Sequence, residues 1–233
     1  MHGQRDKVVI MNRIMHPADM FGVIRTQRNY DTVGLNMDFK FHVEPRDRVL
    51  YVFFQESNGT KDWFHNVKII PSRIEPIDGC GFFVHGGFAR VWRSGNEIVL
   101  DRLEEKLERR QFAGFQVVFG GFSHGGPLAS LAAHEWFART NRREQCIIFG
   151  APKFAWGDDA VAQFQRSAIH THWVNPADAI TRVPLSRWGF SHVDRTLVTV
   201  PGNNIFSVVN INRQHQIYGE HSIYPENWQR AAV

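Results

Sequence analysis

The sequence predicts an α/β fold with a mostly parallel central sheet flanked by helices. Residues 115–122 and 146–150 are short apolar runs, which are typical of strands buried on both faces of a parallel sheet. Each run is followed by a segment with helical spacing, 127–140 and 158–166, and a further strand is predicted at 172–175. This alternation of strand and helix indicates right-handed β-α-β units.

The N-terminal elements precede this alternation. Residues 7–26 mix apolar and polar positions in a helix-like way, so residues 1–36 are expected to be a helical segment that packs on the remainder. Apolar and polar residues alternate over 37–43, and residues 48–54 are rich in Val, Leu, Tyr and Phe. Turn residues at 44–47 join the two segments. They are expected to form a strand pair.

Two further elements lie between the strand pair and the first buried strand. Residues 79–88 are punctuated by glycine and expected to be extended, whereas 96–111 have the apolar stripe of an amphipathic helix. No internal repeat or long linker interrupts the chain. Residues 1–233 are therefore expected to form one domain.

Composition excludes several classes of protein. With 43% hydrophobic and 21% charged residues the chain has material for a core, and its two cysteines, Cys80 and Cys146, are too few for a disulfide framework or a zinc ribbon. The net charge is only +4, and the basic residues are scattered, which argues against nucleic acid as a partner. Weak attraction to anionic lipid is compatible with this charge.

Hydropathy gives an expectation about localisation. No segment approaches the roughly 18 apolar residues that span a bilayer. The apolar run near the N-terminus is shorter than a signal-peptide core of about 7–15 residues. The sequence thus predicts a protein that stays in the cytoplasm or leaves by a route without a signal peptide.

The strongest chemical motif is Gly121-Phe122-Ser123-His124-Gly125, which fits G-x-S-x-G. In this pattern a serine nucleophile sits on a sharp turn between a strand and a helix, and the glycines avoid collisions there. Three fixed positions arise by chance in roughly one such sequence in ten, but here a buried strand precedes the serine and a helix follows. The alternative is a glycine-rich turn that binds a phosphate at the helix N-terminus.

A serine nucleophile needs a base and a carboxylate that orients the base, in the chain order Ser, Asp or Glu, His. Asp178 lies just after the predicted strand 172–175, where such a carboxylate belongs, and Asp194 is its main competitor. Three histidines follow, and spacing does not rank them: His192, His215 and His221.

Five blocks of the sequence stand in the order known from one enzyme family. They are Val84-His85-Gly86-Gly87-Phe88 for V-H-x-G-F, Gly121 to Ala129 for G-H-S-L-G-G-A-L-A, Ile148 to Lys153 for T-F-G-x-P-R, Val174 to Pro184 for V-N-x-x-D-x-V-P-x-x-P, and His221-Ser222-Ile223-Tyr224 for H-x-x-Y. From about residue 37 to 227 the chain resembles the class 3 lipases, the fungal-lipase-like branch of the α/β hydrolases. One departure is that the histidine follows the serine instead of preceding it.

The resemblance implies an α/β-hydrolase fold and a serine hydrolase that cleaves carboxylic esters, most simply lipids or acylglycerols. By alignment of the motifs, the resemblance implies that the catalytic triad consists of Ser123, Asp178 and His221. His221 is favoured because it begins the late H-x-x-Y block. It implies lipid or ester substrates, which could be met at a membrane or micelle interface. It requires no metal and no organic cofactor.

The resemblance also places the oxyanion hole. In the family an F-R-G-[ST] segment stands a few residues before D-W, which matches Asp62-Trp63 here. Counting back from this pair aligns Phe54-Gln55-Glu56-Ser57 with that segment, so Ser57 would supply one donor and the backbone of His124 the other. Glu56 occupies the family's glycine position, and Thr60 is the alternative donor. Residues Trp63 to Ile70 stand where the family often has a lid helix, although a core-packing helix fits the pattern equally.

Two other classes of function stay open. The first is a non-catalytic lipid-binding or structural domain on the same fold, which would have little reason to keep Ser123, Asp178 and His221 together. The second keeps the triad but acts on another acyl substrate, as a thioesterase, peptidase or acyltransferase.

Several histidines are expected to be structural. The segment beginning at His134 resembles H-E-x-x-H, but Ala138 stands at the position of the second zinc ligand. His170 and His172 could share a strand face, but no third ligand stands at a readable spacing. His85 belongs to an extended segment and is expected to be a structural histidine of a sheet and not a catalytic one.

Overall fold

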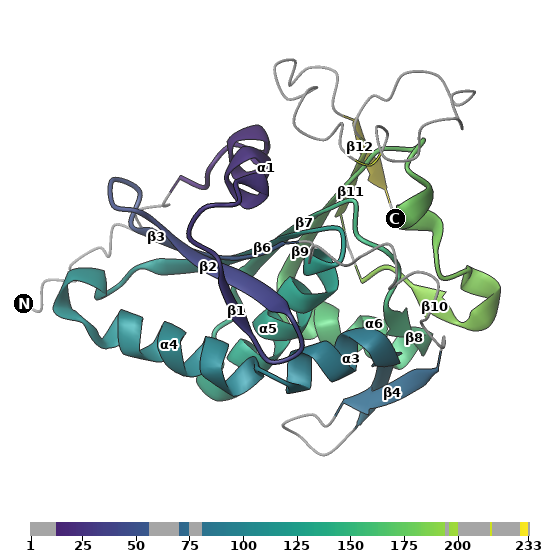
Figure 1. The fold of residues 1–233 in the computed structure, drawn as a ribbon. Helices are drawn as coiled ribbons and strands as arrows, with labels where there is room; N and C mark the ends of the chain where they lie inside the picture. Colours follow the sequence, from purple (N-terminus) through teal and green to yellow (C-terminus); the bar gives the residue numbers. More distant parts are fainter. Residues whose placement is uncertain are drawn as a thin grey trace, which may run out of the picture.

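An eight-stranded sheet forms the centre of the molecule, in the order β1-β2-β3-β6-β7-β9-β11-β12 (Figure 1). The computed structural model describes residues 13–55, 70–74, 81–193, 196–199, 215 and 229–232. The strands are β1 (Asp31–Val33), β2 (Met37–Glu44), β3 (Val49–Phe54), β6 (Gln116–Phe122), β7 (Gln145–Phe149), β9 (Ile169–Val174), β11 (Thr196–Thr199) and β12 (Gln229–Ala232). From β3 to β11 all neighbours are parallel, while β1, β2 and β12 pair antiparallel at the edges. The predicted mostly parallel sheet is confirmed.

Helices cover both faces of this sheet (Figure 1). They are α1 (Pro17–Arg25), α3 (Gly86–Arg93), α4 (Asn96–Glu108), α5 (Gly125–Thr140) and α6 (Gly157–Ser167), with the 3-10 turns η1 (Arg110–Phe112), η2 (Ala179–Arg182) and η3 (Ser186–Trp188). Helix α1 lies on one face, and α3 to α6 lie on the other. None of the helices within the described ranges is both long and apolar enough to cross a membrane.

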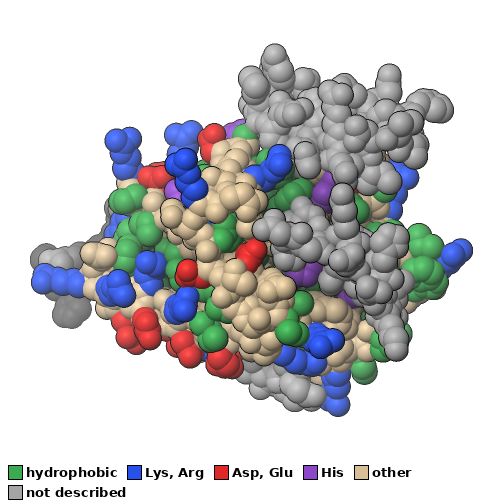
Figure 2. All heavy atoms as spheres, in the orientation of Figure 1, with side chains coloured by type: hydrophobic (Ala, Val, Ile, Leu, Met, Phe, Trp, Pro, Cys, Tyr) green, Lys and Arg blue, Asp and Glu red, His purple; other side chains and the backbone are tan. Residues whose placement is uncertain are grey.

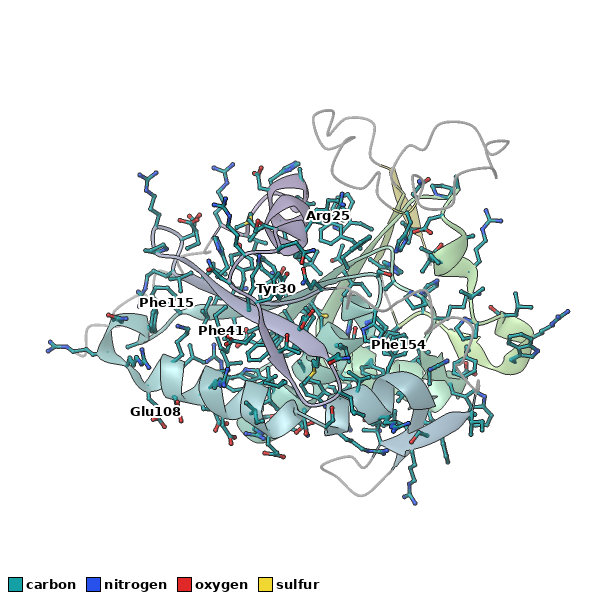
Figure 3. The ribbon with its side chains drawn as sticks, viewed as in Figure 1. Arg25, Tyr30, Phe41, Glu108, Phe115 and Phe154 are labelled. Atoms are coloured by element: carbon teal, nitrogen blue, oxygen red, sulfur yellow. The ribbon has the colours of Figure 1, made fainter. Side chains whose placement is uncertain are left out.

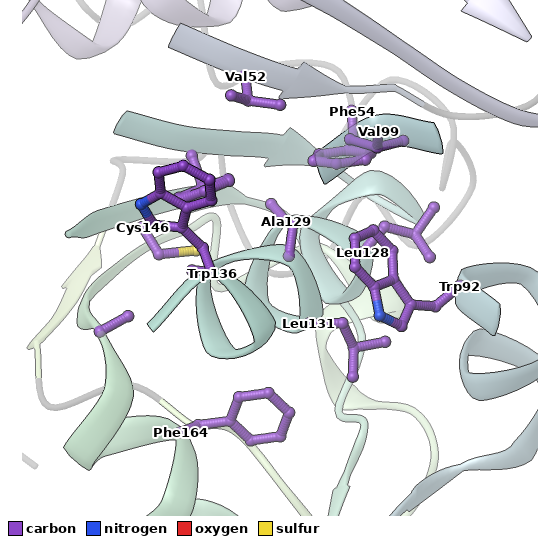
Figure 4. Packing of buried hydrophobic residues seen from close by; sticks show 14 of the residues in the cluster. Val52, Phe54, Trp92, Val99, Leu128, Ala129, Leu131, Trp136, Cys146 and Phe164 are labelled. Carbon is purple, nitrogen blue, oxygen red and sulfur yellow. The ribbon is translucent and has the colours of Figure 1, made fainter. Parts of the chain in front are cut away.

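The larger core lies between the sheet and α3 to α6. Figure 4 shows Val52 and Phe54 of β3 facing Leu128 and Ala129 of α5, with Trp92 of α3 alongside. Strand β6 is apolar on both faces because its residues alternate between two cores. Its Val117 and Phe119 belong to this larger cluster, and Val118 and Phe122 belong to the cluster under α1.

Helix α1 is held on the sheet by apolar contacts and by one buried lysine. Met20, Phe21 and Ile24 are buried in the smaller core. Lys40 of β2 donates from Nζ to the carbonyl oxygens of Val23 (2.5 Å) and Thr26 (3.2 Å), which are acceptors at the helix C-terminus.

This side of the sheet also carries Tyr30, whose ring lies 4.4 Å from Lys40 Nζ. Burial lowers the pKa of Lys40 to about 8. Figure 3 shows Arg25 and Tyr30 on the α1 side of the sheet and Phe154 on the opposite side. The helix predicted over 7–26 starts at Pro17 in the described part of the chain, and residues 1–12 lie outside it. The expectation that 1–36 is helical is wrong for Asp31–Val33, which form strand β1.

A second, smaller sheet has the antiparallel order β10-β8-β5-β4. Its strands are β4 (Pro71–Ile74), β5 (Phe82–His85), β8 (Ala155–Trp156) and β10 (Phe190–Ser191). The sequence did not predict this sheet, because strands of two residues show no period. The expectation that 79–88 is extended holds for 82–85 and is wrong from Gly86, where α3 begins. A Cβ on Gly86 would lie 2.6 Å from the carbonyl oxygen of Ile70, so this helix starts on a residue that usually breaks helices.

Candidate active site

Ser123 occupies the turn between β6 and α5. Its φ is +53°, in the left-handed region that a side chain disfavours. Two hydrogen bonds hold this conformation: the N–H of Ser123 donates to the Phe149 carbonyl (2.9 Å), and its own carbonyl accepts from the N–H of Gly126 (3.1 Å). Strain of this kind persists only where the surroundings fix it, and it is typical of functional sites.

The glycines of G-x-S-x-G have steric reasons in this fold. A Cβ on Gly121 would lie 2.2 Å from the carbonyl oxygen of Gly125, and a Cβ on Gly125 would lie 2.3 Å from that of Phe54. Strand, turn, helix and the neighbouring strand β3 therefore meet too closely for side chains. This is the geometry that the motif predicts for a serine at the top of the sheet.

Asp178 lies just after β9, and its side chain is completely buried. Its carboxylate accepts two hydrogen bonds: Oδ1 from the N–H of Ile180 (2.9 Å) and Oδ2 from Nδ1 of His215 (2.7 Å). Its backbone N–H donates to the carbonyl of Asn175 (2.9 Å). The carboxylate is thus fixed toward a histidine, as the sequence predicts for this position, while Asp194 lies outside the described residues.

The histidine on Asp178 is His215. Its ring stacks on Phe122, the residue before Ser123, with ring centroids 4.7 Å apart and 30° between the planes. His215 therefore lies between the carboxylate and the strand end that carries the serine. The family resemblance favours His221 instead, and His221 lies outside the described residues.

His192 supports the turn that carries Asp178. Its Nε2 lies 2.9 Å from the carbonyl oxygen of Thr181 in η2, and the Thr181 hydroxyl donates to the Asp178 carbonyl (2.9 Å). The ring of His192 packs against that of His172, whose Nε2 accepts the N–H of Ala151 (3.0 Å). Both histidines hold loops at the carboxyl ends of the strands. Among the described residues no group of three potential ligands forms a metal site.

The zinc-like segment in α5 has a structural role. Glu135 accepts hydrogen bonds from Trp92 Nε1 (2.7 Å) and Asn96 Nδ2 (2.9 Å), which link α5 to α3 and α4. His134 Nδ1 lies 3.1 Å from the hydroxyl of Ser167. The interpretation of this segment as part of the helix behind the nucleophile agrees with these contacts.

Two buried imidazoles lie next to the serine turn. The rings of His85 and His124 each lie 5.1 Å from the ring of Phe88. His85 Nδ1 accepts the N–H of Gly87 (3.2 Å) and so caps α3, which is the structural role expected for it. Burial lowers the pKa of both histidines to about 4, and the charge of His85 lowers that of His124 further.

Acid is expected to destabilise the fold through these two imidazoles. Their folded pKa of about 4 lies below the ordinary value of 6.5, so the unfolded chain binds more protons between these values. Their contribution to stability is complete above pH 6.5 and is lost as pH falls toward 4, by up to about 3 kcal/mol per histidine. Urea unfolding at a series of pH values measures this loss. His124→Leu should show a shallower pH dependence, and an unchanged dependence would contradict the assignment.

The predicted oxyanion residues are described only in part. His124 stands at the start of α5, where backbone N–H groups lack partners within the helix. Ser57 and its alternative Thr60 lie outside the described residues, as do positions 63–69 of the segment expected to be a lid helix or a core-packing helix. Ile70, the last residue of that segment, is 59% exposed.

Comparisons with known proteins agree with this geometry. The family model for Lipase (class 3) matches residues 51–188. The secreted mono- and diacylglycerol lipase 2 of Gibberella zeae is 27% identical over 130 residues, which cover 50% of this chain and 31% of that protein. The triacylglyceride lipase of Rhizomucor miehei superposes with a TM-score of 0.66 at 16% identity, over 76% of this chain and 66% of that chain.

A further solved structure is a triacylglycerol lipase whose catalytic centre is described as a serine protease triad. It superposes with a TM-score of 0.65 at 18% identity, over 75% of this chain and 66% of that chain. These structural similarities show that this chain has the α/β-hydrolase fold. The chain spans 31% of the length of the Gibberella relative and 66% of these two solved lipases.

Proposed function

The chain belongs to the class 3 lipase family, and we propose that it is a serine hydrolase that cleaves carboxylic esters of acylglycerols or other lipids. One observation carries the proposal. His215 is hydrogen-bonded through Nδ1 to the buried Asp178 and stacked on Phe122, directly before the strained Ser123. A non-catalytic domain on this fold would need neither the left-handed serine nor the buried pair.

In the proposed reaction Ser123 Oγ attacks the acyl carbonyl. His215 takes the serine proton at Nε2 and gives it to the leaving alcohol, so that an acyl-enzyme remains. Asp178 keeps the imidazole in the tautomer with a proton on Nδ1 and stabilises the imidazolium that forms. Water then attacks the acyl-enzyme, again with His215 as base, and releases the carboxylic acid and the free serine.

We assign the oxyanion donors to the backbone N–H of His124 and the side chain of Ser57. Support for His124 comes from its place at the N-terminus of α5, where the helix dipole favours negative charge. Ser57 follows β3, the strand next to β6, in the chain, and it aligns with the donor position of the family. Residues 63–70 are proposed as the lid.

A panel of substrates tests the function. The protein should hydrolyse glycerol esters and p-nitrophenyl esters of short to long acyl chains, at rates above those for matched thioesters and anilides. If 63–70 is a lid, the rate should rise abruptly when the substrate exceeds its solubility limit. Faster turnover of the thioester or anilide would point to another acyl substrate, and a constant rate across the limit would remove the lid from the proposal.

A further inference from the structure

Three exposed aromatic side chains lie together at the small sheet: Phe83 (40% exposed), Trp156 (39%) and Trp188 (45%). The rings of Phe83 and Trp156 are 5.6 Å apart in an edge arrangement, and Trp156 Nε1 donates to the Trp188 carbonyl (3.0 Å). The described residues contain no other exposed Phe or Trp. We call these three residues the aromatic patch.

Strand register explains why the aromatic patch is contiguous. Arg73 of β4, Phe83 of β5 and Trp156 of β8 stand directly opposite one another, and opposite residues share one face of a sheet. The row continues on β10 with Phe190, which is buried and lies 5.5 Å from the ring of His85. This row of opposite residues thus runs from the exposed aromatic patch to the buried Phe190, which lies beside one of the histidines next to the serine turn.

Three basic side chains flank the aromatic patch. The Arg187 guanidinium lies over the ring of Trp188 at 5.6 Å, and Lys153 Nζ is hydrogen-bonded to η3 (2.7 Å). Arg73 stands opposite Phe83. In Figure 2, hydrophobic and Lys or Arg side chains gather along the right-hand edge, where Figure 1 shows β8 and β10. Two acidic residues, Asp158 and Asp159, follow Trp156 in the first turn of α6, so three basic side chains stand against two acidic ones around the patch.

We propose that the aromatic patch docks the protein onto a lipid surface that carries anionic headgroups. Indole and phenyl rings insert at the boundary between headgroups and acyl chains, and basic side chains around them attract anionic lipid. The net charge of +4 has the same sign as the rim. The biological use of this docking rests on the proposed function, since it would hold a lipid-cleaving site at its substrate.

Vesicle sedimentation tests the docking without reference to catalysis. The vesicles consist of ether-linked phosphatidylcholine with or without ether-linked phosphatidylserine, and ether lipids offer no ester to cleave. Wild type should bind the vesicles that contain phosphatidylserine at least about tenfold more tightly than the vesicles of phosphatidylcholine alone. Phe83→Ser/Trp188→Ser should weaken that binding about tenfold or more, because the two aromatic rings that insert into the lipid are lost. Trp156 is kept, since its indole holds η3.

The matched control is Leu35→Ser/Ile98→Ser, which removes two hydrophobic residues of similar exposure (47% and 43%) away from the small sheet. This variant should bind as wild type does, and both variants should keep the thermal unfolding midpoint and the hydrolysis of a soluble ester. Unchanged vesicle binding in the patch variant, or equal binding to both vesicle types, would overturn the proposal. So would a wild-type dimer that the patch variant converts to a monomer while vesicle binding persists.

Failure of the proposed function gives a different pattern. A wild-type protein that hydrolyses no ester but sediments with phosphatidylserine vesicles through the aromatic patch would contradict the enzyme assignment alone. A protein that hydrolyses esters but does not sediment would contradict the docking alone.

Discussion

Replacing Ser123 with alanine is expected to lower kcat on a soluble short-chain ester by about 10⁴- to 10⁶-fold, the range for loss of a triad nucleophile. The reason is that the proposed reaction forms the acyl bond on this hydroxyl, at the strained turn. A fluorophosphonate probe should label wild type at Ser123 and should leave Ser123→Ala unlabelled. Initial rates and mass spectrometry of the labelled peptide measure both effects.

Two variants separate chemistry from folding. Ser130→Ala removes another buried hydroxyl of α5, which donates to the Gly126 carbonyl (3.1 Å) and lies 3.7 Å from Cys146 Sγ of β7. This variant should keep both labelling and turnover. Ser123→Gly should be as inactive as Ser123→Ala but more stable by about 1 kcal/mol, because glycine adopts a left-handed φ without strain. Equal labelling of wild type and Ser123→Ala would refute the nucleophile.

The serine turn and its carboxylate could be predicted because their causes are local. The run 115–122 is apolar at every position that β6 buries, and Gly121 and Gly125 mark where strand, turn and helix meet. Asp178 could be placed because it directly follows a strand, and the carboxyl ends of parallel strands share one edge of a sheet.

The histidine could not be placed by the same reasoning. The chain between Asp178 and the candidate base is long, and no period or turn residue fixes which histidine returns to the carboxylate. The H-x-x-Y resemblance favours His221, whereas a contact between His215 and both Asp178 and Phe122 is a long-range feature of the folded chain. The one-domain interpretation of residues 1–233 and the donor role of Ser57 stay predictions.

The small sheet escaped prediction for another reason. Strands β8 and β10 have two residues each, too few to show alternation, and α3 begins on Gly86, a residue that predicts a turn. The sequence does not show that the exposed Phe83 and Trp156 are neighbours, because only the register of β5 and β8 places them opposite each other.

The choice of base gives the second large effect. His215→Ala is expected to reduce kcat by about 10⁴- to 10⁶-fold, as for loss of a triad histidine, because Asp178 would have no imidazole to orient. His221→Ala should retain near wild-type turnover. His192→Ala should fall between them, because this histidine holds the Thr181 carbonyl in the turn that carries Asp178 and acts on the carboxylate only through that turn.

The same three variants decide between the histidines whichever way the rates fall. Thermal unfolding checks that each variant is folded, and Asp178→Asn should cost about 10⁴-fold, because an amide stabilises the wrong imidazole tautomer. Soluble short-chain esters are the substrate, so that changes in binding to lipid do not enter the rates. Loss of turnover in His221→Ala with retention in His215→Ala would return the base to His221. The pairing of His215 with Asp178 would then be a structural contact beneath the site, since a hydrogen bond between imidazole and carboxylate stabilises a fold whether or not the ring also moves a proton.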